Sequence, residues 1–176
     1  MTAEELFDLP DDDFRYELVN GVLARMTPTG AEHGVVAART GQFLSEHVSA
    51  FGLGVCCGAE TGFILRRAPD VVRAPDAGFV SQRRIPEPGV PTGYWPFAPD
   101  LAVEVVSPTD RPTDLRAKIG EYFSAGSQQV WVVEPATRTV HAYRGPHDVQ
   151  VFGIDDELTG DEMLPGFRCP VGRLFP

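Results

Sequence analysis

The chain has 176 residues, 43% of them hydrophobic, which is enough for one ordinary core and too few for two comfortable domains. Its formal net charge of −10 argues against nucleic-acid binding through a broad basic face, so any such role must depend on local sites. The absence of a long apolar run or a signal-peptide pattern excludes a membrane partner, and we expect a single cytoplasmic domain over residues 1–176.

The N-terminal segment predicts a short helix followed by a β-hairpin. Residues 2–5, Thr-Ala-Glu-Glu, have the form of a capping box, and the helix should end near Leu9, before Pro10 and the acidic run at 11–13. Asn20-Gly21 stands between two apolar runs and is typical of a hairpin turn. Glu17 in this hairpin is either a site residue, a solvated side chain or a cross-strand partner of Arg25.

Residues 31–51 have the apolar spacing of a long amphipathic helix. His33 falls in its first turn, where it either faces a cleft or is a simple helix-start residue. Residues 55–58 and 61–66 predict two strands, or one strand bent at Gly58. Two further strands are expected around residues 71–73 and 78–80, on either side of Asp76.

The run at 101–106 is the most informative strand because it carries Glu104 among apolar residues. A buried carboxylate must be paired, neutralised or bound to a metal, and we expect Asp76 and Lys118 nearby. The alternative is an ion pair between Glu104 and Arg111 or Arg116. In the proline-rich loop at 83–99, Tyr94 and Trp95 favour loop packing over base stacking.

A helix is predicted from about residue 114 to 125, capped by Asp110 or Thr113, with Lys118 at the edge of its apolar stripe of Leu115, Ile119, Tyr122 and Phe123. Lys118 is the only lysine of the chain, since every other basic residue is arginine. Its compact ammonium group has a more easily shifted pKa than a guanidinium. A buried strand at 129–135 and a meander at 139–143 and 149–152 follow, and the tail at 164–175 is predicted to be irregular.

Two carboxylates at the ends of neighbouring strands, with a lysine on the next helix, form a plausible site for one Mg²⁺ ion. The three cysteines do not indicate a zinc site or a disulfide framework, because their number is odd and no CxxC spacing occurs.

Several segments together carry a more specific signal: residues 16–21 (Tyr-Glu-Leu-Val-Asn-Gly), His33, 74–76 (Ala-Pro-Asp), 99–108, 114–118 with Tyr122 and Gly126, 131–135 and 164–167. In this order, and over nearly the whole chain, they resemble the Uma-two family of putative restriction endonucleases, within the PD-(D/E)XK nuclease superfamily. The resemblance implies an α/β, restriction-endonuclease-like mixed β-sheet flanked by helices, here with an N-terminal β-hairpin and a C-terminal β-meander. It also implies hydrolysis of nucleic-acid phosphodiester bonds, with DNA expected rather than RNA, and a divalent metal, Mg²⁺ or Mn²⁺.

The resemblance also implies roles for individual residues. Asp76 and Glu104 match the two acidic motif positions, and with the carbonyl of Val105 they are expected to hold the metal. Val106 stands where the superfamily usually has lysine, and Lys118 matches a lysine that has moved to the following helix. The catalytic set then comprises Asp76, Glu104, Lys118, Glu17 and His33. Glu17 would act as a base or bind a second metal through water, and His33 would touch a phosphate or a water.

Two other functional classes remain open at this point. The acidic composition suits a catalytically inactive nucleic-acid-binding or regulatory module that keeps the nuclease fold. A small-molecule phosphodiesterase would use the same residues on a smaller substrate. A homodimer is also expected, formed through a sheet edge or the apolar tail.

Overall fold

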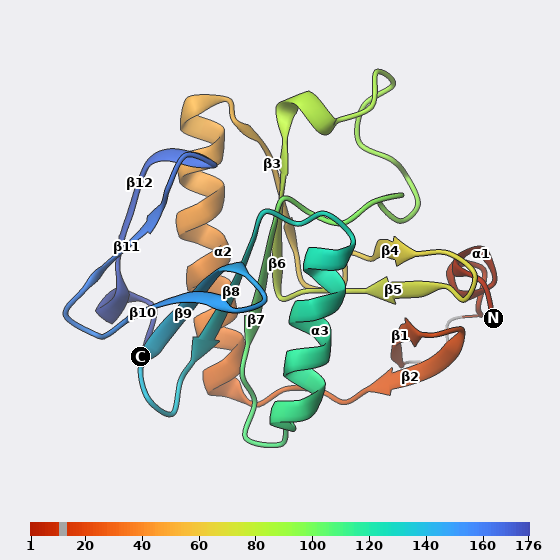
Figure 1. The fold of residues 1–176 in the computed structure, drawn as a ribbon, viewed down its shortest axis with the longest axis horizontal. Coiled ribbons are helices and arrows are strands. Elements are labelled where there is room, and N and C mark those ends of the chain that lie inside the picture. The colour runs from red at the N-terminus through yellow and green to blue at the C-terminus, as the bar shows by residue number, and fades with distance from the viewer. Residues whose placement is uncertain (11–13) are drawn as a thin grey trace.

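The computed structural model describes residues 1–10 and 14–176. Its largest sheet contains β3 (Gly54–Gly58), β6 (Ala77–Ser81), β7 (Leu101–Val105), β8 (Gln129–Glu134), β9 (Thr139–Gly145) and β10 (Asp148–Phe152). The strand order is β10-β9-β8-β7-β6-β3 (Figure 1). Only β7 and β8 run parallel and the other neighbours are antiparallel, so the sheet is mixed, as expected.

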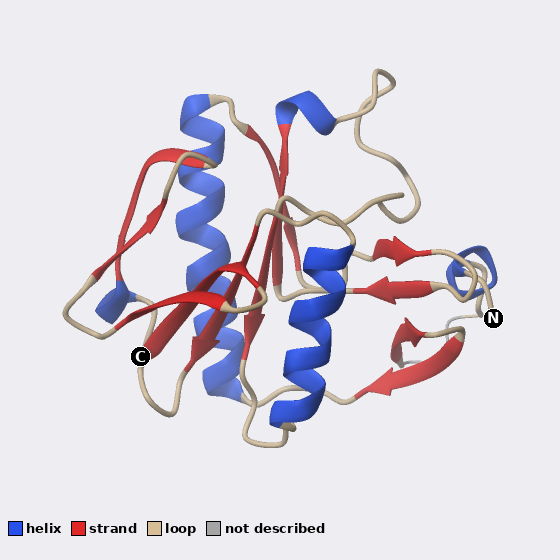
Figure 2. Cartoon of the chain, viewed as in Figure 1, coloured by secondary structure: helices blue, strands red, loops and turns tan. Residues whose placement is uncertain are grey.

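Two helices, α2 (Ala31–Phe51) and α3 (Pro112–Ser124), cover opposite faces of this sheet (Figure 2). Successive side chains of β7 point to opposite faces of the sheet, so they show which residues each helix covers. Leu101, Val103 and Val105 pack in the core that includes α2, whereas Ala102 packs with residues of α3. Glu104 has the same parity as Ala102, and this places the buried carboxylate on the α3 face.

A second sheet has four antiparallel strands, β1 (Arg15–Val19), β2 (Val22–Met26), β4 (Phe63–Arg66) and β5 (Val71–Arg73), in the order β2-β1-β5-β4. Helix α1 (Ala3–Phe7) packs against it through Ala3 and Leu6. The hairpin turn at Asn20 and Gly21 has positive φ at both residues, and the capping box of α1 is present. These two local predictions are confirmed, while the acidic run at 11–13 lies outside the described residues.

The two sheets are joined by the short segment between β5 and β6, and Asp76 lies in it. The predicted strands at 55–58 and 61–66 are separate: β3 belongs to the six-stranded sheet and β4 to the four-stranded sheet. The loop that precedes β7 packs back on the protein, because Trp95 is buried and forms a bridge with Phe63. Loop packing of Trp95, the preferred interpretation, is confirmed.

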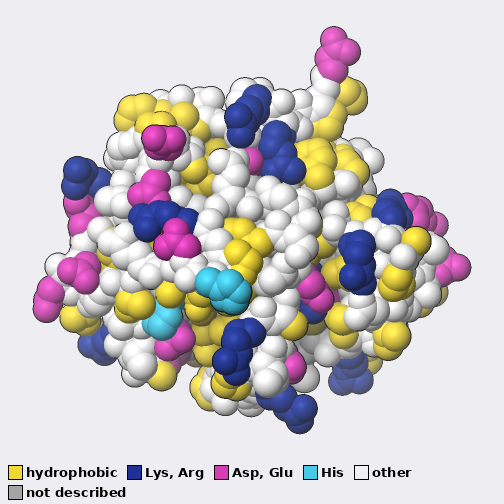
Figure 3. Space-filling model, viewed as in Figure 1, with side chains coloured by type: hydrophobic (Ala, Val, Ile, Leu, Met, Phe, Trp, Pro, Cys, Tyr) yellow, Lys and Arg dark blue, Asp and Glu magenta, His cyan; other side chains and the backbone are white. Residues whose placement is uncertain are grey.

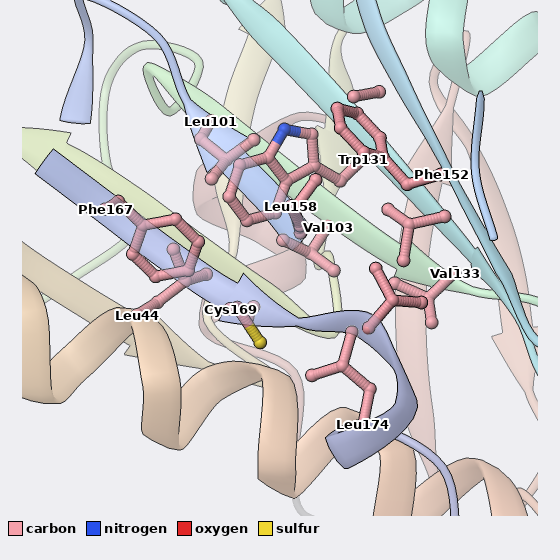
Figure 4. Packing of buried hydrophobic residues seen from close by; sticks show 14 of the residues in the cluster. Leu44, Leu101, Val103, Trp131, Val133, Phe152, Leu158, Phe167, Cys169 and Leu174 are labelled. Carbon is pink, nitrogen blue, oxygen red and sulfur yellow. The ribbon is translucent and has the colours of Figure 1, made fainter. Parts of the chain in front are cut away.

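The C-terminal tail is more regular than predicted. Strands β11 (Glu157–Gly160) and β12 (Leu164–Pro170) form an antiparallel ribbon. Phe167 and Cys169 of β12 are buried against Leu44 of α2 and Trp131 of β8 (Figure 4). The irregular tail was a wrong prediction because Gly166, at φ +76°, breaks the alternation of buried and exposed residues that identifies a strand.

The start of α3 also differs from the prediction. Neither Asp110 nor Thr113 caps the helix, because Arg111 is the N-cap residue and Pro112 opens the first turn. The Asp110 carboxylate instead accepts a hydrogen bond of 2.8 Å from the backbone N–H of Ser107. Across residues 1–10 and 14–176, we find no helix with the length and apolarity needed to span a bilayer.

Candidate active site

Glu104 is buried on β7, and both of its carboxylate oxygens have partners on α3. The Tyr122 hydroxyl donates to Oε1 at 2.7 Å, and the Lys118 ammonium donates to Oε2 at 3.2 Å. Neither Arg111 nor Arg116, the alternative partners, makes an ion pair with Glu104 among the described residues. Burial raises the pKa of Glu104; Lys118 lowers it, and repulsion from Glu17 and Asp76 raises it further. The carboxylate is therefore held in a fixed orientation, but burial and the neighbouring carboxylates disfavour its ionised form.

Lys118 bridges two carboxylates that come from different sheets. Its Nζ lies 3.2 Å from Oε2 of Glu104 and 3.3 Å from Oε1 of Glu17. Burial alone would lower the pKa of Lys118, but these two carboxylates outweigh it and raise the pKa overall. Lys118 therefore remains an ammonium ion over the range in which proteins normally work, and it acts as a cation rather than as a base.

Glu17 is a buried member of the same network. Arg73 of β5 donates to its Oε2 at 2.6 Å, and the backbone N–H of Ala74 donates to its Oε1 at 3.1 Å. The hairpin register pairs Arg25 with Tyr16 and not with Glu17, so the cross-strand and solvated interpretations of Glu17 were wrong. Arg73 also donates to Glu121 of α3 at 2.7 Å and thereby ties the small sheet to the helix that carries Lys118.

Asp76 directly precedes β6, and extending the β6–β7 register, in which Ala77 pairs with Val103, places it opposite Glu104. Its Oδ2 accepts a hydrogen bond of 2.7 Å from the backbone N–H of Val105 and lies 3.4 Å from Nε2 of His33. The contact with Asp76 raises the pKa of His33 against the effect of burial, and the Val105 backbone carbonyl adds to the increase. His33 is buried in the first turn of α2, and its Nδ1 has no hydrogen-bond partner among the described residues.

The cluster carries more negative than positive charge. With His33 neutral, four carboxylates meet two permanent cations, a surplus of two negative charges: Glu17, Asp76, Glu104 and Glu121 against Arg73 and Lys118. Because buried charge needs compensation, this surplus suits a divalent cation.

The oxygen donors also suit Mg²⁺, which takes one or two carboxylates and fills its other positions with water and substrate oxygens. Asp76, Glu104 and the Val105 carbonyl are such donors. Within the described part of the chain no group of three or more His, Cys, Asp or Glu side chains has the geometry of a metal cage. The residues thus fit a partly hydrated ion, and they do not fit an all-protein site of the zinc type.

Two cavities open onto the cluster from different sides. Glu104, Val105 and Lys118 line a cavity of about 170 Å³ at the N-terminus of α3. Asp76 and His33 line a larger groove of about 1100 Å³ between the β1–β2 hairpin and α2. The hydrogen bond from the Val105 backbone N–H to Asp76 connects a residue lining the smaller cavity with one lining the groove.

The sequence interpretation missed three members of the network: Arg73, Glu121 and Tyr122. Arg73 carried a usable signal, since a charged residue ending the buried run Val71–Arg73 needs a partner just as Glu104 does. Glu121 offered only its position one helical turn after Lys118, and Tyr122 had been assigned to the apolar stripe of α3. The Tyr122 ring is buried as predicted, but its hydroxyl serves the site.

Comparison with known proteins identifies the class and then the family. A crystal structure of a putative nuclease belonging to DUF820 from Anabaena variabilis ATCC 29413 superposes with a TM-score of 0.85, covering 99% of this chain and 97% of that chain at 21% identity. The chain therefore shares the fold of that putative nuclease. Residues 3–172 match the model of the Uma2 family, described as putative restriction endonuclease, and the chain belongs to this family. No curated protein matches it.

Proposed function

We propose that the protein is a divalent-metal-dependent endonuclease that hydrolyses phosphodiester bonds, with DNA as the preferred substrate. The observation that carries this proposal is the surplus of two negative charges around the only lysine of the chain, in a nuclease fold. A purely structural ion-pair network would be expected to balance its charges, whereas this one has more carboxylates than permanent cations, an excess that a bound cation would offset.

Asp76, Glu104 and the carbonyl of Val105 would hold the ion, with Mg²⁺ or Mn²⁺ as the candidates. When bound, such an ion supplies Lewis-acid stabilisation of the charge that develops on the phosphoryl oxygens. Tyr122 fixes the orientation of the Glu104 carboxylate through its hydrogen bond to Oε1. This leaves Oε2 on the side of Lys118, facing the smaller cavity.

Lys118 would donate to a non-bridging oxygen of the scissile phosphate. Its ammonium is preorganised by Glu17 and Glu104, so little reorganisation is needed when negative charge develops nearby. Glu17 acts mainly by placing this ammonium, because its two oxygens are already bonded to Arg73 and the Ala74 backbone. A direct role of Glu17 as a base is less consistent with these contacts.

His33 would contact the substrate phosphate or its attacking water from the α2 side. Its Nε2 is oriented by Asp76, and its buried Nδ1 still needs a hydrogen-bond partner. In neutral His33 this Nδ1 is an acceptor and a water would satisfy it by donating a hydrogen bond, whereas in protonated His33 it is a donor and a phosphate oxygen would satisfy it.

The test is cleavage of plasmid and single-stranded DNA with Mg²⁺ or Mn²⁺ by the wild-type protein and matched variants. Glu104→Gln and Lys118→Ala should each lose at least a hundredfold in rate, the scale typical of removing one preorganised charged group. Glu46→Gln and Arg116→Ala alter exposed residues on α2 and α3 and should cleave like the wild type. Equal cleavage by all five proteins would refute the assignment.

The alternative of a catalytically inactive module is favoured by one observation, that both oxygens of Glu104 already have protein partners. Such a module would bind nucleic acid without cleaving it. Cytoplasmic location and the homodimer stay predictions.

A further inference from the structure

The larger groove reaches the candidate active site at Asp76 and His33, whereas Glu104 and Lys118 line the smaller cavity. The groove runs between α2 and the β1–β2 hairpin, and Asp76 and His33 line its inner part. At about 1100 Å³ it exceeds the usual 300–1,000 Å³ of small-molecule pockets, so it has room for more than one small ligand.

The side of the groove formed by α2 is built from small residues. Gly34, Ala37, Ala38 and Gly41 line it in succession. A Cβ atom added to Gly34 would meet nothing within 4 Å, and one added to Gly41 would only reach Ala77 at 4.0 Å. The groove is therefore open at this helix, and a flexible chain can approach the backbone closely.

The opposite side carries aromatic rings. Phe14, Tyr16 and Tyr94 all line the groove, and Phe14 remains 45% exposed. The Phe14 and Tyr16 rings meet edge to face at 6.5 Å, and the Arg25 guanidinium lies 3.5 Å from the centre of the Phe14 ring. Arg25 thus covers one face of the Phe14 ring, and the exposed remainder of that ring beside Tyr16 is a surface on which a nucleobase could stack.

The groove offers little positive charge. Of the described residues that line it, Arg15 is the single lysine or arginine, and it is paired with Glu60. Basic and acidic side chains are also interspersed on the face shown in Figure 3. A duplex depends heavily on many cations that contact its two phosphate backbones, whereas a single strand can bind largely through base stacking.

We propose that this groove binds one single strand of nucleic acid, with its bases against Phe14 and Tyr16 and its backbone leading to Asp76 and His33. This inference rests on the proposed nuclease function and specifies its substrate class as single-stranded rather than duplex. His33, whose buried Nδ1 has no hydrogen-bond partner among the described residues, lines the groove beside Asp76.

The test is binding of a fluorescently labelled single-stranded DNA of about ten nucleotides, within the range of known single-strand sites. The protein carries Glu104→Gln and Mg²⁺ is present, so that cleavage does not interfere. The single strand should bind at least tenfold more tightly than the same sequence as a duplex. Adding Phe14→Ala should weaken its binding by about 5- to 150-fold, the scale of losing one stacked base.

A second variant narrows the groove without removing a stacking ring. Gly34→Leu places a side chain in open space next to His33, and it should strengthen α2 because leucine is the better helix former. It should weaken single-strand binding at least tenfold with no loss of thermal stability. Gly120→Leu on α3 and Phe51→Ala at the exposed end of α2 lie outside the groove and should bind like the parent.

Equal or tighter binding of the duplex, no measurable binding of the single strand, or unchanged affinity in both groove variants would each overturn the proposal. Cleavage by the wild-type protein is measured in a separate assay, which distinguishes the nuclease function from strand binding in the groove. Retained groove-dependent binding without cleavage would refute the nuclease function and support the groove. Duplex cleavage that Phe14→Ala and Gly34→Leu leave unchanged would refute single-strand binding in the groove and leave the nuclease function intact.

Discussion

Glu104 illustrates how a residue can serve a site at the expense of stability. Its pKa is raised by burial, so the native state holds a proton at this position more tightly than the unfolded chain does. The contribution of this group to the free energy of unfolding is therefore greatest below the unfolded pKa near 4.5 and falls as the pH rises through the folded-state pKa.

Glu104→Gln should remove that pH dependence. Glutamine can still accept a hydrogen bond from Lys118 and donate one to the Tyr122 hydroxyl, so the contacts survive without the charge. We expect its melting temperature at pH 7 to exceed that of the wild type by roughly 2–4 °C, corresponding to about 1 kcal/mol. The difference should shrink toward pH 4. A melting temperature below that of the wild type at pH 7 would show that ionised Glu104 stabilises the fold.

Lys118, unlike ionised Glu104, should stabilise the fold, because it is the partner of two buried carboxylates. Lys118→Ala leaves both without this cation and should destabilise the protein by about 3–5 kcal/mol, measured by urea denaturation. Because its pKa is raised, this stabilisation is fully present below the unfolded value of 10.5 and is lost progressively as the pH rises from there through the folded-state pKa. Arg116→Ala, two residues away and exposed, serves as the control and should change stability by less than about 0.5 kcal/mol.

At the scale of the elements, local signals predicted most of the fold. The capping box before α1, the Asn20-Gly21 turn and the apolar spacing of α2 are complete within short windows of sequence, and each element is present. The assignment of β3 and β4 to different sheets could not be predicted, because partner strands are chosen by contacts between distant residues. The strand character of β12 was hidden by a positive-φ glycine at position 166.

The β12 strand should be essential to the core that it completes. The Phe167 ring is buried and lies 5.5 Å from the Trp131 ring. Phe167→Ala should cost about 3–5 kcal/mol in the free energy of unfolding. Phe51→Ala, at a ring that is 65% exposed, should cost far less. Similar denaturation midpoints for the two variants would mean that the C-terminal ribbon does not pack stably on α2.

At the scale of the whole molecule, the net charge of −10 limits how nucleic acid can be bound. If Arg15 and Lys118 supply the phosphate contacts, the logarithm of the binding constant for a single strand should fall with the logarithm of salt concentration with a slope of about −1.4. This is measured by fluorescence anisotropy over a salt series. A slope steeper than about −5 would indicate a broad basic interface that the composition does not favour.

The candidate site was predictable in part. Asp76, Glu104 and Lys118 were identified because a carboxylate inside an apolar strand and a solitary lysine are visible in the sequence, and the family resemblance assigned their roles. The Arg73–Glu121 ion pair could not be predicted, since it joins residues 48 positions apart. It depends on the packing of the small sheet against α3, which no local sequence pattern encodes. The single-domain expectation for residues 1–176 stays a prediction.

The most direct test of the divalent-ion site is calorimetric titration of Mn²⁺ into the protein without nucleic acid. We predict one ion bound per chain by the wild type and by Glu46→Gln, and at least tenfold weaker binding by Asp76→Asn and Glu104→Gln, because each removes one of the two carboxylates offered to the ion. Equal affinity in all four proteins, or no binding by the wild type, would contradict it.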